Sequence, residues 1–255
     1  MQPHERIGAA IAQANKEGRT GLVPFITAGY PQPEEFIETL RAVADKGDVV
    51  ELGIPFSDPM ADGMTIQRSS FVAIENGVTL RWIFDQLDAV DEPIGTPLVM
   101  MSYLNPLLAF GYENLATRAR DAGVCAFIVP DLPLEESDEI RAALDARGVG
   151  LIQLVTPATP DDRLQTLADT SRGFLYAVTI TGITGGDVGL PLDLADYLDR
   201  VASISEIPVC AGFGIRTAQD VVNVGKHVAG AIVGSALVEV LERGEDPAAF
   251  LAGLR

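Results

Sequence analysis

The sequence predicts an α/β protein built as a single (β/α)8 TIM barrel with an extra N-terminal helix. Eight short runs along the 255 residues are nearly continuous in apolar side chains, as strands covered on both faces are. Helical patterns lie between the runs, and eight such units in about 250 residues are typical of this barrel. The predicted strands are residues 22–27, 48–52, 97–101, 125–129, 150–155, 174–178, 208–211 and 230–233.

The predicted helices show apolar spacing and start signals. Residues 1–18, MQPHERIGAAIAQANKEG, have the pattern of a short amphipathic helix. Pro33-Glu34-Glu35 opens a second helix, and Thr217 with Asp220 three residues later resembles a capping box. Apolar residues at i, i+4 and i+7 predict two helix faces, made by Phe36, Leu40 and Val43 and by Leu194, Leu198 and Val201.

The whole chain, residues 1–255, is expected to form one domain. It contains no linker rich in Ser, Gly or Pro, no low-complexity tract and no block of like charges. A doubly wound fold would show a GxGxxG turn after the first strand, and that motif is not present.

Composition and charge exclude several classes of function. The formal net charge of −18 argues against nucleic-acid binding, which needs a basic surface. It also disfavours anionic ligands at long range, so a phosphate group would have to be held by backbone N–H groups and a helix N-terminus. With two histidines, His4 and His227, and no CxxC or HExxH, we expect no metal site.

The expected location is the cytoplasm. No apolar run approaches the roughly 20 residues of a membrane helix, and the N-terminus lacks the apolar region of a signal peptide. Cys125 and Cys210 each lie in a strand-like run and are predicted to be small buried hydrophobes in a reducing compartment.

The segment from Glu51 to Gly63, ELGIPFSDPMADG, carries the strongest functional signal. Glu51 lies in an apolar strand, where burying a charge is costly, and Asp62 closes the loop that follows. Two acids facing one substrate suit acid–base chemistry, in which one carboxyl moves a proton and the other holds a polar group. The structural alternative is a satisfied strand-end carboxylate and a turn former.

Two connections after strands are unusual and are predicted to shape the active site. The segment 53–79 is long for a βα connection, and the segment 179–191 contains four glycines. Such loops at the carboxyl ends of barrel strands commonly form lids and active sites. The second loop could therefore close over the acids of the first.

A phosphate site is predicted after the seventh and eighth strands. Gly212-Phe213-Gly214 follows one strand, and Gly234-Ser235 follows the other and opens a helix. Barrels commonly bind phosphate with these two loops and a helix N-terminus. Ordinary βα turns also use Gly and Ser, which is the alternative interpretation.

These motifs, taken together, resemble the tryptophan synthase α-subunit family. They follow the family's order from about residue 20 to residue 240. Besides ELGIPFSDPMADG, the matching segments are Val23-Pro24-Phe25-Ile26-Thr27-Ala28-Gly29, Thr65-Ile66-Gln67, Val129-Pro130-Asp131-Leu132-Pro133, Gly182-Ile183-Thr184-Gly185, Ala211-Gly212-Phe213-Gly214-Ile215 and Val233-Gly234-Ser235-Ala236.

The resemblance implies a retro-aldol cleavage of indole-3-glycerol phosphate to indole and glyceraldehyde 3-phosphate, with no cofactor. Glu51 matches the general acid–base residue that moves the proton at indole C3 and at the glycerol hydroxyl. Asp62 matches the carboxylate that binds the indole N–H and stabilises the indolenine cation.

The resemblance also implies supporting residues. Tyr176 matches a residue near the scissile bond, and Thr184 matches a lid threonine that contacts Asp62. The matches to the phosphate site are Gly185, Phe213, Gly214, Gly234 and Ser235. The candidates for an apolar indole pocket are Phe25, Ile66, Tyr103, Ile128 and Leu154. Apolar residues at strand ends are also ordinary core residues, which is the alternative for this last set.

Three positions depart from the family pattern. Met64 follows Gly63 where the family usually has proline, which predicts a less rigid loop. Ile180 stands where some members carry arginine, and the segment Lys46-Gly47-Asp48-Val49 is one residue shorter than the common form.

The family implies a partner, a tryptophan synthase β subunit that carries pyridoxal phosphate and receives indole in an αββα complex. The loops after the second and sixth strands and Asp131-Leu132-Pro133 would face it. Three rival interpretations remain: a lyase of the same fold that works alone, a non-catalytic subunit that activates a partner, and another phosphate-binding isomerase or epimerase. The last would need a catalytic Lys or His at a strand end, and neither is present.

Overall fold

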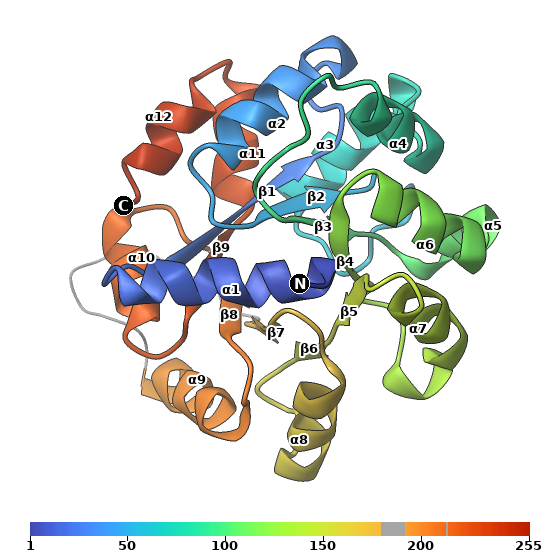
Figure 1. The fold of residues 1–255 in the computed structure, drawn as a ribbon. Helices are drawn as coiled ribbons and strands as arrows, with labels where there is room; N and C mark the ends of the chain where they lie inside the picture. The colour runs from blue at the N-terminus through green and yellow to red at the C-terminus, as the bar shows by residue number, and fades with distance from the viewer. Residues whose placement is uncertain (180–191, 213) are drawn as a thin grey trace.

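The computed structural model describes residues 1–179, 192–212 and 214–255. These residues form nine parallel strand segments and twelve α-helices arranged as a nearly closed (β/α)8 barrel, which confirms the predicted fold class (Figure 1). The strands lie in the order β5-β4-β3-β2-β1-β9-β8-β7-β6. Their bounds are β1 Gly21–Thr27, β2 Val50–Gly53, β3 Leu98–Met101, β4 Val124–Ile128, β5 Gly150–Ile152, β6 Leu154–Val155, β7 Leu175–Val178, β8 Val209–Gly212 and β9 Gly230–Val233.

Eight strands were predicted, and the fifth is divided in two at Gln153. Its backbone N–H donates to Ser171 Oγ at 2.9 Å instead of to a neighbouring strand. The part before Gln153, β5, pairs with β4, and the part after it, β6, pairs with β7. One broken strand therefore joins the two ends of the sheet, which closes the barrel.

Helices follow the strands and surround them (Figure 1). The predicted apolar helix face made by Phe36, Leu40 and Val43 is buried. Thr217 and Asp220 form the predicted capping box. The α-helices are α1 Pro3–Lys16, α2 Phe36–Ala44, α3 Met64–Glu75, α4 Leu80–Asp88, α5 Leu104–Phe110, α6 Tyr112–Asp121, α7 Asp138–Asp145, α8 Asp161–Thr170, α9 Leu192–Ile204, α10 Ala218–Gly225, α11 Ser235–Glu242 and α12 Pro247–Ala252, with short 3-10 turns at Pro33–Glu35 and Leu134–Glu136.

The predicted extra helix, α1, lies across one end of the barrel (Figure 1). Ile7 and Ile11 are fully buried and join the apolar cluster inside the barrel. Polar contacts fix the helix at both ends: His4 Nδ1 lies 2.9 Å from Gly148 O, and Asn15 Nδ2 donates to Ala229 O at 2.9 Å. The helix thus closes the amino-terminal end of the barrel and leaves the carboxyl end open.

Side chains that point into the barrel alternate along each strand. The inner cluster includes Val23, Val99 and Phe174, whereas the larger cluster lies between the strands and the helices. Successive side chains of a strand point to opposite faces, so the residue two positions further along also points into the barrel and lies nearer its carboxyl end. Phe25, Met101 and Tyr176 occupy these positions, so the alternation selects the residues that face the open end.

Three further observations concern sequence predictions. Cys125 and Cys210 are buried free thiols, as predicted. No helix within the described ranges is long and apolar enough to cross a membrane. No group of three His, Cys, Asp or Glu side chains in the described part of the chain is arranged to bind a metal ion.

The packing of α1 leads to a testable prediction. Ile11→Ala removes a fully buried side chain between α1 and the barrel, and is expected to lower the free energy of unfolding by about 2–5 kcal/mol. Urea denaturation measures this change. Lys16→Ala, on the exposed side of α1, is the control and should cost less than about 1 kcal/mol. Equal losses in the two variants would contradict the proposed packing.

Candidate active site

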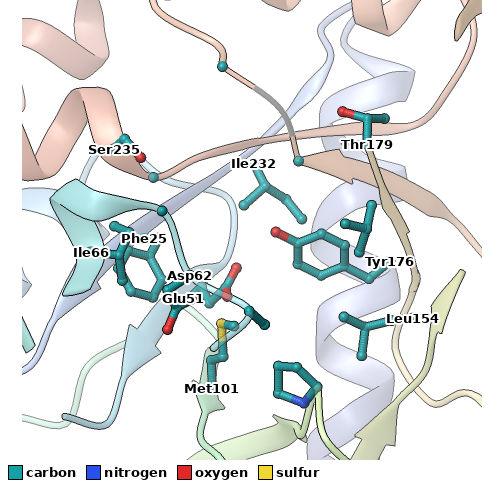
Figure 2. A pocket seen from close by; sticks show the side chains of 17 residues that line it. Phe25, Glu51, Asp62, Ile66, Met101, Leu154, Tyr176, Thr179, Ile232 and Ser235 are labelled. Carbon is teal, nitrogen blue, oxygen red and sulfur yellow. The ribbon is translucent and has the colours of Figure 1, made fainter. Parts of the chain in front are cut away.

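A cavity of about 300 Å³ opens at the carboxyl ends of the strands (Figure 2). Residues from the strands and from the connections that follow β2, β4, β7, β8 and β9 converge on it. Nine of the residues predicted for the site from sequence line it. The lining consists of Phe25, Glu51, Ala61, Asp62, Gly63, Ile66, Met101, Pro130, Leu154, Tyr176, Val178, Thr179, Gly212, Gly214, Ile232, Gly234 and Ser235.

Glu51 lies on β2 and points into the barrel, where its side chain is almost completely buried. Its Oε2 atom has no hydrogen-bond partner among the described residues. Burial, and then the charge of Asp62, raises the pKa of Glu51 from its ordinary 4.5 to about 8. The carboxyl is therefore protonated at neutral pH, which avoids the high cost of a buried unpaired charge.

Asp62 lies on the loop between β2 and α3 and faces the same cavity as Glu51 (Figure 2). Tyr103 Oη donates to Asp62 Oδ2 at 3.1 Å and accepts from the backbone N–H of Ala61 at 2.8 Å. Burial raises the pKa of Asp62 to about 6, and the hydrogen bond from Tyr103 opposes that rise. Asp62 is thus mainly ionised at neutral pH while Glu51 keeps its proton.

Tyr103, a candidate for the indole pocket, does not line the main cavity. It lies behind Asp62, lines a smaller adjoining cavity and stacks on Phe56 with ring centroids 5.0 Å apart. Through its hydroxyl group it fixes both Asp62 and the backbone of the preceding residue. This contact could not be predicted from local sequence patterns, because Tyr103 and Asp62 are far apart along the chain.

Tyr176 projects from β7 toward the centre of the cavity (Figure 2). Its hydroxyl fits over Gly212, where an added Cβ atom would lie 2.4 Å from Oη. Burial, followed by the charges of Glu51 and Asp62, raises the pKa of Tyr176 well above its ordinary value. The hydroxyl therefore remains a neutral hydrogen-bonding group beside the two acids.

The predicted phosphate residues Gly214, Gly234 and Ser235 lie on one side of the cavity. Helix α11 begins at Ser235, and Leu237 N and Val238 N donate to Gly234 O at 2.9 and 3.1 Å. The N–H groups of Ser235 and Ala236 precede these and have no acceptor within the helix. No Lys or Arg is found among the described residues that line the cavity. An anion held here would depend on N–H groups and the helix dipole.

The predicted apolar residues divide between the cavity and the core. Phe25, Ile66 and Leu154 line the cavity. Ile128 is fully buried in the inner cluster on β4 and does not line it. Ile128 pairs in register with Met101 on the neighbouring strand, yet of these two residues Met101 lines the cavity and Ile128 lies in the inner cluster.

Several lining residues were missed from sequence. Met101 and Val178 end their strands and face inward, and Ile232 precedes the phosphate motif. Alternation counted from the inner residues Val99 and Phe174 would have identified the first two. Pro130 had appeared only as part of a family motif.

Some predicted residues cannot be placed. Thr184, Gly185, Phe213 and the departure at Ile180 lie outside the described residues. The departure at Met64 is the first residue of α3, where its side chain is 76% exposed.

A parallel barrel with an acid-containing cavity at the carboxyl ends of its strands defines the class: the chain is a (β/α)8-barrel enzyme. The family model described as "Tryptophan synthase alpha chain" matches residues 11–252. A tryptophan synthase alpha chain from Nitratidesulfovibrio vulgaris (strain DP4) is 44% identical over 247 residues, covering 96% of each chain. One from Roseiflexus sp. (strain RS-1) is 42% identical, covering 93% of this chain and 92% of the other.

Comparison with solved structures also finds tryptophan synthase alpha chains. Tryptophan synthase subunit alpha from Legionella pneumophila superposes with a TM-score of 0.88 at 31% identity, covering 100% of this chain and 97% of the other. A chain of tryptophan synthase from M. tuberculosis has a TM-score of 0.88 at 30% identity, with 98% and 97% covered. The chain belongs to the tryptophan synthase alpha chain family. It is a carbon–carbon lyase of tryptophan biosynthesis that cleaves indole-3-glycerol phosphate.

The burial of Glu51 predicts how stability depends on pH. Because its folded-state pKa of about 8 lies above the ordinary 4.5, the folded protein holds a proton that the unfolded chain releases. The contribution of Glu51 to the free energy of unfolding of the wild type therefore decreases as the pH rises from 4.5 to about 8. Glutamine does not titrate, so Glu51→Gln does not show this decrease. Its free energy of unfolding minus that of the wild type should therefore grow by about 1.4 kcal/mol per pH unit in that window.

Urea denaturation at several pH values between about 5 and 8 tests this linkage. Glu75→Gln, on an exposed position of α3, is the control for the change in charge. A stability difference between Glu51→Gln and wild type that does not vary with pH would contradict the raised pKa.

Proposed function

We propose that Glu51 and Asp62 carry out the cleavage of indole-3-glycerol phosphate, Glu51 as general acid–base and Asp62 as the group that binds the indole N–H. The observation that supports this most directly is the difference between their pKa values, about 8 and about 6, within one cavity. Near neutral pH one carboxyl can donate a proton while the other carries a negative charge. This division of roles is the one that acid–base catalysis needs.

The reaction then proceeds in two proton transfers. The Glu51 carboxylic acid protonates indole C3, and the resulting indolenine cation is stabilised by the Asp62 carboxylate at N1–H. The Glu51 carboxylate next removes the proton of the glycerol hydroxyl next to the indole ring. The carbon–carbon bond breaks, its electrons return to the indole ring, and the aldehyde of glyceraldehyde 3-phosphate forms. Glu51 ends the cycle protonated, as it began.

Other residues bind the two ends of the substrate. The indole ring lies among Phe25, Ile66 and Leu154, which are apolar residues lining the same cavity as Asp62. The phosphate group binds at Gly214, Gly234 and Ser235, with the N-terminus of α11 offsetting its charge. Tyr176 lies near the scissile bond. The family resemblance assigns Gly185 and Phe213 to the phosphate site and Thr184 to a contact with Asp62, and these three residues lie outside the described part of the chain.

The partner in this proposal is a tryptophan synthase β subunit, and the complex is αββα. Members of the family pair with a β subunit and need no cofactor of their own; the pyridoxal phosphate belongs to that partner. Met60 and Met64 flank Asp62 with 87% and 76% of their surfaces exposed. Large exposed apolar side chains beside the cavity are suited to a protein interface.

We further propose that residues 1–255 form one domain and that the protein works in the cytoplasm. The pairing of β1 with β9 supports the single domain, because it joins the two ends of the chain in one sheet.

Indole release from indole-3-glycerol phosphate tests the function. The purified chain is assayed alone and with a tryptophan synthase β subunit. Slow release that rises greatly with the β subunit supports the proposal. Fast release that ignores the β subunit would favour a lyase that works alone, and no release in either condition would contradict the proposed function.

The acid pair is tested by isosteric substitution. Glu51→Gln and Asp62→Asn should each lower kcat by a factor on the order of 10² or more, because one removes the proton donor and the other the anion beside the cation. Steady-state kinetics with the β subunit present measures both. A wild-type kcat in either variant would remove that residue from the mechanism.

The phosphate site is tested by adding a charge to it. Gly234→Asp should raise KM by about tenfold or more, because like charges about 4 Å apart near a protein surface repel by about 4 kcal/mol, and about 1.4 kcal/mol already corresponds to tenfold. An added Cβ has room there, since its nearest neighbour is Phe25 Cβ at 3.9 Å. Gly95→Asp, at the exposed start of the segment before β3, is the matched control. An unchanged KM would place the phosphate elsewhere.

A further inference from the structure

Glu239 on α11 contacts two other segments of the chain with one carboxylate. Arg216 donates to it through two bonds, from Nη1 to Oε2 at 2.7 Å and from Nη2 to Oε1 at 2.9 Å. Thr65 Oγ1 lies 3.5 Å from Oε1, at the long limit of a hydrogen bond. Three elements, α11, the connection after β8 and the start of α3, therefore meet at one side chain.

Each of these three segments leads directly to the cavity. Arg216 follows the lining residue Gly214 by two positions, and Thr65 follows Asp62 by three. Glu239 stands one helical turn after Ser235 on the same face of α11. The carboxylate thus lies where the phosphate side of the cavity and the loop that carries Asp62 approach each other.

The local structure makes this junction well defined. Glu239 is 26% exposed, and the bonds from Arg216 lower its pKa, so the carboxylate is ionised at neutral pH. The backbone beside Arg216 is held as well, because the N–H groups of Arg216 and Thr217 donate to Asp220 Oδ2 at 3.0 and 2.9 Å. A planar two-bond contact between Arg and a carboxylate fixes orientation as well as distance.

We infer that Glu239 is a positioning residue that couples the phosphate side of the cavity to the Asp62 loop. A phosphate group bound at Gly214 and Ser235 restrains the backbone leading to Arg216 and the start of α11, and Glu239 transmits that restraint through Thr65 to Asp62. Phosphate binding then improves the placement of the carboxylate that binds the indole N–H. This inference rests on the proposed roles of Asp62 and of the phosphate residues.

The same two helices supply a matched control. One turn further along α11, Glu242 accepts two bonds from Arg68 of α3, at 2.9 and 2.6 Å. This pair also joins α3 to α11, but neither residue makes a hydrogen bond or an ion pair with the described residues of the connection after β8. Loss of general helix packing would affect both pairs, whereas loss of coupling should affect Glu239 alone.

The test measures coupling between two ligands by calorimetry. Indole affinity is determined with and without saturating glycerol 3-phosphate, a phosphate probe without the ring, in wild type, Glu239→Gln and Glu242→Gln. In wild type, glycerol 3-phosphate should raise indole affinity several-fold. In Glu239→Gln this enhancement should fall by about two- to fivefold, the range expected for one partly exposed ion pair, while Glu242→Gln keeps it.

A rescue variant separates coupling from a packing defect. Arg216→Glu combined with Glu239→Arg restores a charge pair at the junction and should recover much of the enhancement lost in Glu239→Gln. Full enhancement in Glu239→Gln, or an equal loss in Glu242→Gln, would overturn the inference and leave the proposed function intact. If glycerol 3-phosphate does not bind to wild type at all, the proposed phosphate site fails together with the inference.

Discussion

The burial of the Glu51 carboxyl group inside the barrel is the constraint on which the site depends. A carboxylate without a hydrogen-bond partner costs several kcal/mol to bury, so the group keeps its proton at neutral pH. Burial of this group lowers the free energy of unfolding, and the apolar core around β2 offsets that loss. The same burial makes Glu51 an acid that is available at neutral pH, which is what protonation of a carbon atom requires.

The neighbouring residues maintain the difference between the two acids. Tyr103 donates to Asp62 and favours its ionised form, whereas no described residue does this for Glu51. Gly212 leaves the space that Tyr176 fills beside them. Helix α1 closes the opposite end of the barrel, and the cavity lies at the end where the acids and the start of α11 are found. The fold thus places two chemically identical groups in different environments.

Much of this arrangement could be predicted from sequence, because it depends on local pattern. The apolar runs predict the strands, and the position of Glu51 within one of these runs predicts that its side chain is buried. The break at Gln153 could not be predicted, since it depends on a hydrogen bond from its backbone N–H to Ser171 Oγ, and neither could the contact of Tyr103 with Asp62. Ile128, assigned to the indole pocket only by family resemblance, is a core residue in the inner cluster, and the apolar strand pattern alone does not separate such a residue from a lining residue such as Leu154.

The pH dependence of kcat/KM for indole-3-glycerol phosphate, measured with the β subunit, tests the central claim most directly. Two acids with pKa values of about 6 and about 8 predict a bell-shaped profile, with the alkaline limb reporting Glu51. That limb is decisive, because a phosphate monoester itself titrates near pH 6, at about the acidic limb. A fall in kcat/KM centred near pH 8 would support a protonated Glu51 as the acid. A rate that stays constant to about pH 9 would contradict it.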